Sequence, residues 1–87
     1  MTVKMKKFGE YLVTRQDAKI VLQAIGVVGL IPKLDFNGVK VANHSFADEL
    51  YKGLASQFSP SGLASINVIG ANEYVENCLE AGLATAL

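Results

Sequence analysis

The chain has 87 residues, of which 51% are hydrophobic and 18% are charged, and its formal net charge is zero. This length leaves no room for a second hydrophobic core, and the apolar content is too high for a disordered chain, so we expect one globular domain over residues 1–87. A neutral chain has no overall attraction to nucleic acid or acidic membranes, and we expect neither as a partner.

The charges are unevenly distributed along the sequence. Residues 1–40 carry seven Lys or Arg against three Asp or Glu, a net +4, whereas residues 41–87 carry one Lys against five Asp or Glu, a net −4. If these halves separate in space, the two ends of the molecule differ in charge and would guide a charged partner. Ordinary solvated faces are the alternative explanation.

Three features favour a location in the cytoplasm. The single cysteine, Cys78, excludes an internal disulfide and suits a reducing compartment. The longest apolar run, residues 20–32, is interrupted by polar and glycine residues and is too short to cross a bilayer. Residues 10–17 are too polar for the apolar part of a signal peptide. We therefore expect a cytoplasmic protein.

The N-terminal part predicts an edge strand followed by a capped helix. Val3 and Met5 alternate with lysines, as in a short strand with one buried face. The segment Thr14-Arg15-Gln16-Asp17 predicts a capping box at a helix start, and Gly26 is the expected stop. One apolar face with helical spacing is formed by Ala18, Val21, Leu22 and Ile25.

The remaining residues predict two strands and two helices. Residues 33–36 are expected to form a central strand, and residues 45–57 a helix that ends at a loop over 59–62. Alternation over residues 65–69 predicts another strand, after which Asn72 caps the last helix. The expected core-facing residues are Phe46, Ala47, Leu50, Leu54 and Phe58 in the first of these helices and Val75, Cys78, Leu79 and Ala81 in the last.

Strands that alternate with helices indicate an α/β domain. Short strands joined by crossover helices favour a small, mixed, mostly parallel sheet, here of about four strands with three helices. The edge strand at residues 3–5 leaves pairing between two copies, and hence a homodimer, open.

The sequence lacks the usual motifs for catalysis, cofactors and metals. Neither of the common glycine-rich phosphate loops is present, and one His and one Cys are too few for a zinc site. His44 and Ser45 are adjacent, so their side chains point apart at a helix start, whereas a nucleophile and its base must lie within about 3 Å. We therefore expect no enzymatic activity, no cofactor and no metal.

Ser45 has two interpretations. Serine is among the best N-terminal caps, worth about 1 kcal/mol, and Ser45-x-x-Asp48 fits a capping box. A hydroxyl at a helix start is also where a phosphate is well tolerated, because the helix dipole favours negative charge there. A phosphate would add a charge of about −1.5 to −2 beside Asp48 and Glu49 and would weaken the fit of a docked partner. Arg15 is a candidate to pair with either carboxylate.

Three matches carry a family resemblance, and the second of them consists of two stretches. They are Val13-Thr14-Arg15-Gln16-Asp17-Ala18, then Leu34-Asp35-Phe36-Asn37-Gly38-Val39 followed by Ser45-Phe46-Ala47-Asp48-Glu49-Leu50, and finally Ile66-Asn67-Val68-Ile69-Gly70-Ala71-Asn72. In this order the chain resembles the STAS-like domain family of unknown function. The resemblance implies an α/β domain related to bacterial anti-sigma factor antagonists, in which a histidine-kinase-like ATPase phosphorylates a serine at a helix start. Ser45 falls on that position.

The resemblance implies a non-catalytic protein-interaction domain in a partner-switching circuit, with an ATPase-kinase of the anti-sigma type as the partner. Ser45 would be the phosphoacceptor, and His44, Phe46, Asp48 and Glu49 would form the docking surface. One alternative is a small-ligand or nucleotide-binding sensor that uses the crevice between strand ends and helix starts. The other is a structural subunit of a larger assembly.

Overall fold

Alternating strands and helices form the α/β architecture that the sequence predicts. A computed structural model describes residues 2–86 of the chain. In chain order, the elements are β1 (Thr2–Lys4), the 3-10 helix η1 (Met5–Phe8), β2 (Tyr11–Leu12), α1 (Arg15–Val28), β3 (Lys33–Asp35), β4 (Val41–Ala42), α2 (His44–Ala64), β5 (Asn67–Ile69) and α3 (Glu73–Ala86). The three α-helices match the expected number, and η1 is an addition.

The strands divide between two small parallel sheets. β3 lies between β1 and β5 in one sheet, so residues 33–35 form the central strand and β1 is an edge strand, as predicted. β2 pairs with β4 in the other sheet. The prediction of one sheet of about four strands is therefore wrong. The chain leaves the first sheet through η1 and turns at Gly9, whose φ of 137° favours glycine, so β2 begins a separate ladder.

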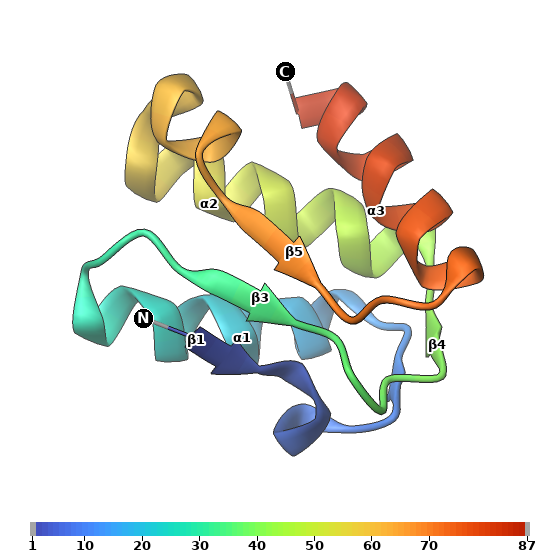
Figure 1. Ribbon diagram of the computed structural model, residues 1–87. Helices are drawn as coiled ribbons and strands as arrows, with labels where there is room; N and C mark the ends of the chain where they lie inside the picture. The colour runs from blue at the N-terminus through green and yellow to red at the C-terminus, as the bar shows by residue number, and fades with distance from the viewer. Residues whose placement is uncertain (1, 87) are drawn as a thin grey trace.

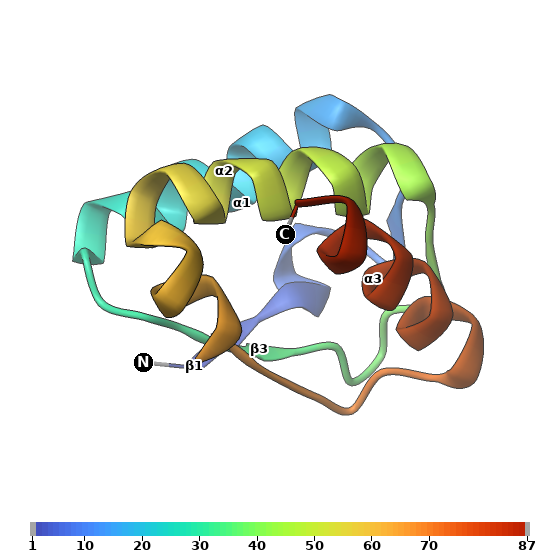
Figure 2. The same cartoon turned by 90° about the horizontal axis from the view of Figure 1, so that it is seen from above.

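The helices cover the three-stranded sheet unequally. α1 and α2 lie side by side above one face of it, and α3 packs against α2 at one end of the molecule (Figures 1 and 2). No helix within residues 2–86 is both long and apolar enough to cross a membrane.

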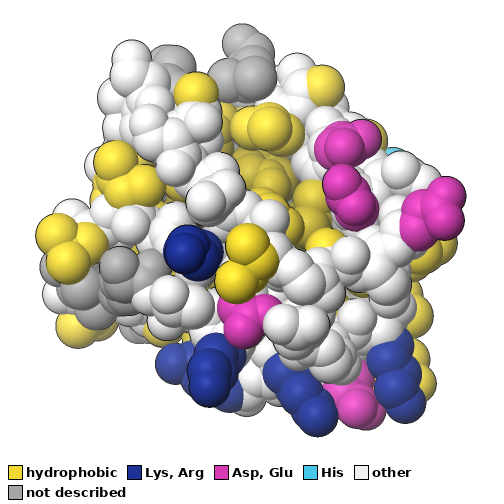
Figure 3. All heavy atoms as spheres, viewed as in Figure 1, with side chains coloured by type: hydrophobic (Ala, Val, Ile, Leu, Met, Phe, Trp, Pro, Cys, Tyr) yellow, Lys and Arg dark blue, Asp and Glu magenta, His cyan; other side chains and the backbone are white. Residues whose placement is uncertain are grey.

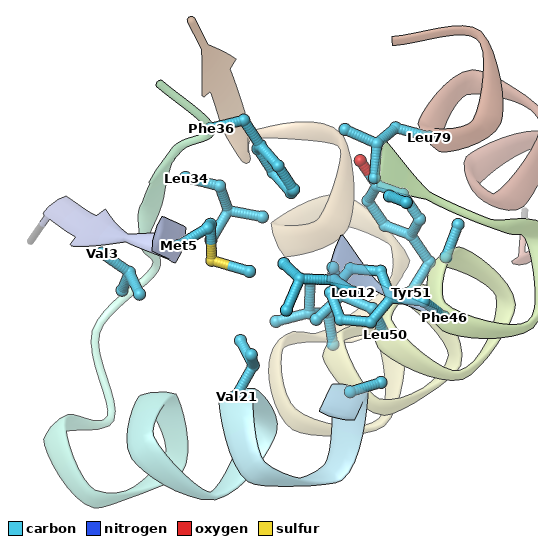
Figure 4. Packing of buried hydrophobic residues seen from close by; sticks show 14 of the residues in the cluster. Val3, Met5, Leu12, Val21, Leu34, Phe36, Phe46, Leu50, Tyr51 and Leu79 are labelled. Atoms are coloured by element: carbon cyan, nitrogen blue, oxygen red, sulfur yellow. The ribbon is translucent and has the colours of Figure 1, made fainter. Parts of the chain in front are cut away.

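The hydrophobic core lies between the sheet and the helices. Figure 4 shows Leu34 and Met5 on the sheet side facing Val21 of α1. The expected apolar face of α1 is confirmed, since all four of its residues are at most 8% exposed. In α3 the buried residues are Val75, Cys78, Leu79 and Gly82. Ala81 was expected to face the core but is exposed, because this stripe passes through position 82 instead.

Local side-chain chemistry sets most of the helix ends. The capping box is present: the Asp17 N–H donates to Thr14 Oγ1 at 3.0 Å, and the Thr14 N–H donates to Asp17 Oδ2 at 3.1 Å. Asn72 caps α3, where its Oδ1 accepts from the Val75 N–H at 2.8 Å. α1 passes through the expected stop at Gly26 and ends at Gly29, which adopts the left-handed conformation with a φ of 75°.

The predicted loop at residues 59–62 is a kink inside α2. The backbone leaves helical geometry at Ser59, with a φ of 69°, and helical turns then resume as far as Ala64. This second part of α2 bends back toward β5 (Figure 1).

Candidate functional site

The start of α2 is held in place by Asn43, not by Ser45. The Asn43 side chain accepts a hydrogen bond from the Phe46 N–H at 3.0 Å and donates one to the Val13 carbonyl oxygen at 2.7 Å. It therefore caps α2 and also ties it to the segment before α1. The predicted cap at Ser45 is wrong, because α2 begins at His44 and Ser45 is its second residue. In the expected capping box, the Asp48 carboxylate would accept a hydrogen bond from the Ser45 N–H. Within residues 2–86 this bond is absent, and Asp48 contacts Arg15 and Lys52 instead.

We expect Asn43→Ala to destabilise the domain by about 1–2 kcal/mol, because it removes both the cap and the bond to Val13. Ser45→Ala should stay within about 0.5 kcal/mol of wild type, because an exposed side chain without a capping role contributes little. Urea denaturation of the two variants measures the difference. Equal losses would contradict the assignment of the cap.

Four residues at the start of α2 have different surroundings. His44 and Ser45 are exposed, Asp48 is half-buried, and Phe46 is fully buried in the core. Figure 4 shows Phe46 beside Leu50 under the helix. The predicted docking role of Phe46 is therefore wrong, since its side chain offers no surface to a partner. It is the third residue of α2, on the face that packs against the sheet.

A cluster of charges joins the starts of α1 and α2. Arg15 Nη1 lies 3.4 Å from Asp48 Oδ2 and 3.2 Å from Glu49 Oε1, which confirms the expected pairing. Lys52 Nζ lies 3.1 Å from the same Asp48 oxygen. Asp48 and Glu49 are neighbours in sequence, and both carboxylates contact the same Arg15 nitrogen. We call Arg15, Asp48, Glu49 and Lys52 the charged cluster.

The pKa of Asp48 lies below its usual value of 3.8, first because of the hydrogen bond from Lys52 and then because of Arg15, while partial desolvation opposes them. A lowered pKa in the folded state adds stability above pH 3.8 and loses it as the pH falls through the folded value. We therefore expect Asp48→Asn to be less stable than wild type at neutral pH, with the gap closing below pH 3.8. Urea midpoints measured along a pH series check this, and a gap that is independent of pH would contradict it.

A shallow pocket adjoins the charged cluster. Its volume is about 250 Å³, and α3 closes one side of it with Ala81, Gly82 and Thr85. His44 and Ser45 form the other side. The Ser45 hydroxyl forms no hydrogen bond with any group in residues 2–86. It is an exposed nucleophilic oxygen at the positive end of a helix, within the same pocket as Arg15.

Sequence reasoning missed several residues of this site. Asn43 was detectable, because asparagine is as good a cap as serine. Lys52 lies four residues after Asp48, a spacing that favours an ion pair on a helix. The α3 side of the pocket left no sequence signal, because it depends on how α3 packs against α2.

The expected site residues thus fall into two groups. His44, Ser45, Asp48 and Glu49 lie together at the surface, whereas Phe46 lies beneath them. Within residues 2–86, no three His, Cys, Asp or Glu side chains gather in a way that could hold a metal ion. The arrangement offers polar and charged groups for a protein contact and one hydroxyl for modification.

A comparison with family models identifies the fold family. The model described as a STAS-like domain of unknown function (DUF4325) matches residues 33–76, from β3 to the first turn of α3. No curated protein matches the chain, and no solved structure does. The match spans the whole start of α2 and about half of the chain, so the protein belongs to the family of STAS-like domains of unknown function.

Proposed function

We propose that this STAS-like domain is a non-catalytic protein-interaction domain whose partner docks at the start of α2 and is released when Ser45 is phosphorylated. The observation that carries the proposal is the free hydroxyl of Ser45. Because Asn43 supplies the cap, the fold does not require that hydroxyl. Its exposure leaves it accessible to a kinase.

The docking surface consists of His44, Asp48 and Glu49 around Ser45. These side chains are exposed or half-buried; His44 and Asp48 line the shallow pocket against α3, and Glu49 lies next to Asp48 on α2. Arg15 and Lys52 offset the charges of the two carboxylates, so the surface before phosphorylation accepts a partner that places an acidic group over Ser45 and Arg15.

A phosphate on Ser45 would act on the charged cluster. It would carry a charge of about −1.5 to −2 at the N-terminus of α2, where the helix dipole stabilises it. It would also compete with Asp48 and Glu49 for Arg15, since guanidinium groups bind phosphate strongly. Once released from Arg15, the carboxylates would add to the negative charge that the partner meets. The fold would persist while the docking surface changed.

The partner follows from the family resemblance. In anti-sigma factor antagonists, which STAS-like domains resemble, a histidine-kinase-like ATPase both binds the domain and phosphorylates the serine. We assign the same kind of partner here, with Ser45 as its substrate.

A pull-down with matched baits tests this function. Wild type, Ser45→Ala, Ser45→Asp and Ser56→Asp are used on native lysate, where Ser56 is another exposed serine of α2 that lies outside the pocket. We expect an ATPase-kinase with all baits except Ser45→Asp, whose capture should fall about tenfold or more because like charges then oppose docking. Equal capture by all four baits would overturn the switch.

A further inference from the structure

A second cavity lies between β5 and α3, apart from the pocket at Ser45. Its volume is about 300 Å³, at the lower end of the range of about 300–1,000 Å³ that is typical of small-molecule sites. In Figure 3 it is a hollow of hydrophobic side chains bordered on one side by acidic ones. The apolar walls consist mainly of Leu63, Ile66, Val68, Leu79 and Leu83.

Tyr51 of α2 supplies a polar group at the closed side of this cavity. Its side chain is only 3% exposed, and its hydroxyl forms no hydrogen bond within residues 2–86. In the same residues, no fully buried side-chain oxygen or nitrogen lacks a partner. The small accessible part of Tyr51 therefore includes its hydroxyl, which faces the cavity; Figure 4 shows it directed toward Leu79 of α3.

Burial raises the pKa of Tyr51 to about 12, so the hydroxyl stays protonated at neutral pH and remains a hydrogen-bond donor. The hydroxyl has no partner among the described residues, so its donor is free for a group that enters the cavity. A ligand oxygen inside the cavity would be such a group.

Glu76 and Glu80 stand at the open side of the cavity. Both belong to α3, are exposed and lie four residues apart, so their like charges repel each other. Neither forms an ion pair with a Lys or Arg of the described chain. A cation between them would remove this repulsion.

We propose that the cavity binds a small organic cation, with its apolar body between β5 and α3, an oxygen at the Tyr51 hydroxyl and an ammonium group between Glu76 and Glu80. The three parts of the site lie in the order that such a ligand requires: a polar end inside, apolar walls, and negative charge at the mouth. The site shares no residue with the docking surface around Ser45, so the two proposals stand or fall separately.

Four probes of one shape separate the contributions. Tyramine carries a phenol and an ammonium group, tyrosol replaces the ammonium by a neutral hydroxyl, 3-(4-hydroxyphenyl)propionate replaces it by a carboxylate, and phenethylamine lacks the phenol oxygen. Each is titrated into ¹⁵N-labelled protein while amide shifts are followed. We expect saturable shifts at Val68, Ala71 and Leu83, and tyramine binding about tenfold tighter than tyrosol because of its charge.

Three variants then assign the contacts. Glu76→Gln with Glu80→Gln should remove the preference for tyramine over tyrosol. Glu73→Gln should keep it, because Glu73 lies on the same helix but outside the cavity. Tyr51→Phe should weaken tyramine several-fold and leave phenethylamine unchanged.

The amide spectra show directly whether each variant is folded. The proposal is overturned if no probe gives saturable shifts at these amides, if the charged and neutral probes bind equally, or if the double glutamine variant keeps the preference.

Discussion

Phe46→Ala is expected to destabilise the domain by about 3–5 kcal/mol, because it removes a fully buried aromatic side chain and leaves a cavity between α2 and the sheet. Typical domains are stable by only about 5–15 kcal/mol, and small ones lie at the lower end, so this loss would leave much of the protein unfolded. Ala47, Leu50 and Tyr51, which follow it in α2, are themselves buried, and a packed core relaxes only partly around such a cavity.

Urea denaturation of wild type and Phe46→Ala measures this loss. His44→Ala is the matched control, since His44 is exposed two positions earlier and should change stability by less than about 0.5 kcal/mol. If Phe46 were a docking residue at the surface, its removal would weaken partner binding and leave the denaturation midpoint unchanged. That result would contradict the packing of α2 described above.

Gly82→Ala is expected to destabilise the protein by about 1–3 kcal/mol, although alanine is the better helix former by about 1 kcal/mol. A Cβ at Gly82 would lie 2.7 Å from the Ala47 Cβ and 3.0 Å from the Ala47 carbonyl carbon. Backbone atoms cannot move aside as the end of a flexible side chain can, so α3 would have to shift away from α2. The same shift would open the pocket beside Ser45, because Gly82 lines it.

Gly26→Ala is the matched comparison, and its effect should have the opposite sign. Gly26 is also inside a helix, but a Cβ there would meet the Gln57 side chain at 3.6 Å, an ordinary contact. The substitution should stabilise the protein by about 0.5–1 kcal/mol. Thermal or urea denaturation of both variants checks the pair. If Gly82→Ala and Gly26→Ala both stabilised the protein, the close approach of α2 and α3 at Gly82 would be contradicted.

Features that depend on neighbouring residues were predictable from the sequence. The capping box at Thr14 and the cap at Asn72 each need only one short segment, and both are present. One tertiary contact was also predictable: the pairing of Arg15 with Asp48 and Glu49 required only that two helix starts meet, which the parallel order of strands favours.

The other features that depend on tertiary packing were not predictable. Asn43 and Ser45 are both good caps. Asn43 is favoured because its side chain also donates a hydrogen bond to the Val13 carbonyl oxygen, 30 positions earlier in the chain. Phe46 fits both an apolar helix face and a docking motif, and only the packing shows that it is core. Strands of two residues, such as β2 and β4, are too short to carry an alternating pattern, so the division into two sheets had no sequence signal.

The most direct test of the function proposed here is the phosphate content of Ser45 in free and partner-bound protein. The untagged protein is isolated from its native cells, free and complexed fractions are separated by size, and phosphoserine is mapped by mass spectrometry in each. We expect phosphate at Ser45 in the free fraction and little or none in the complex. Equal phosphorylation of Ser45 in both fractions, or none in either, would contradict it.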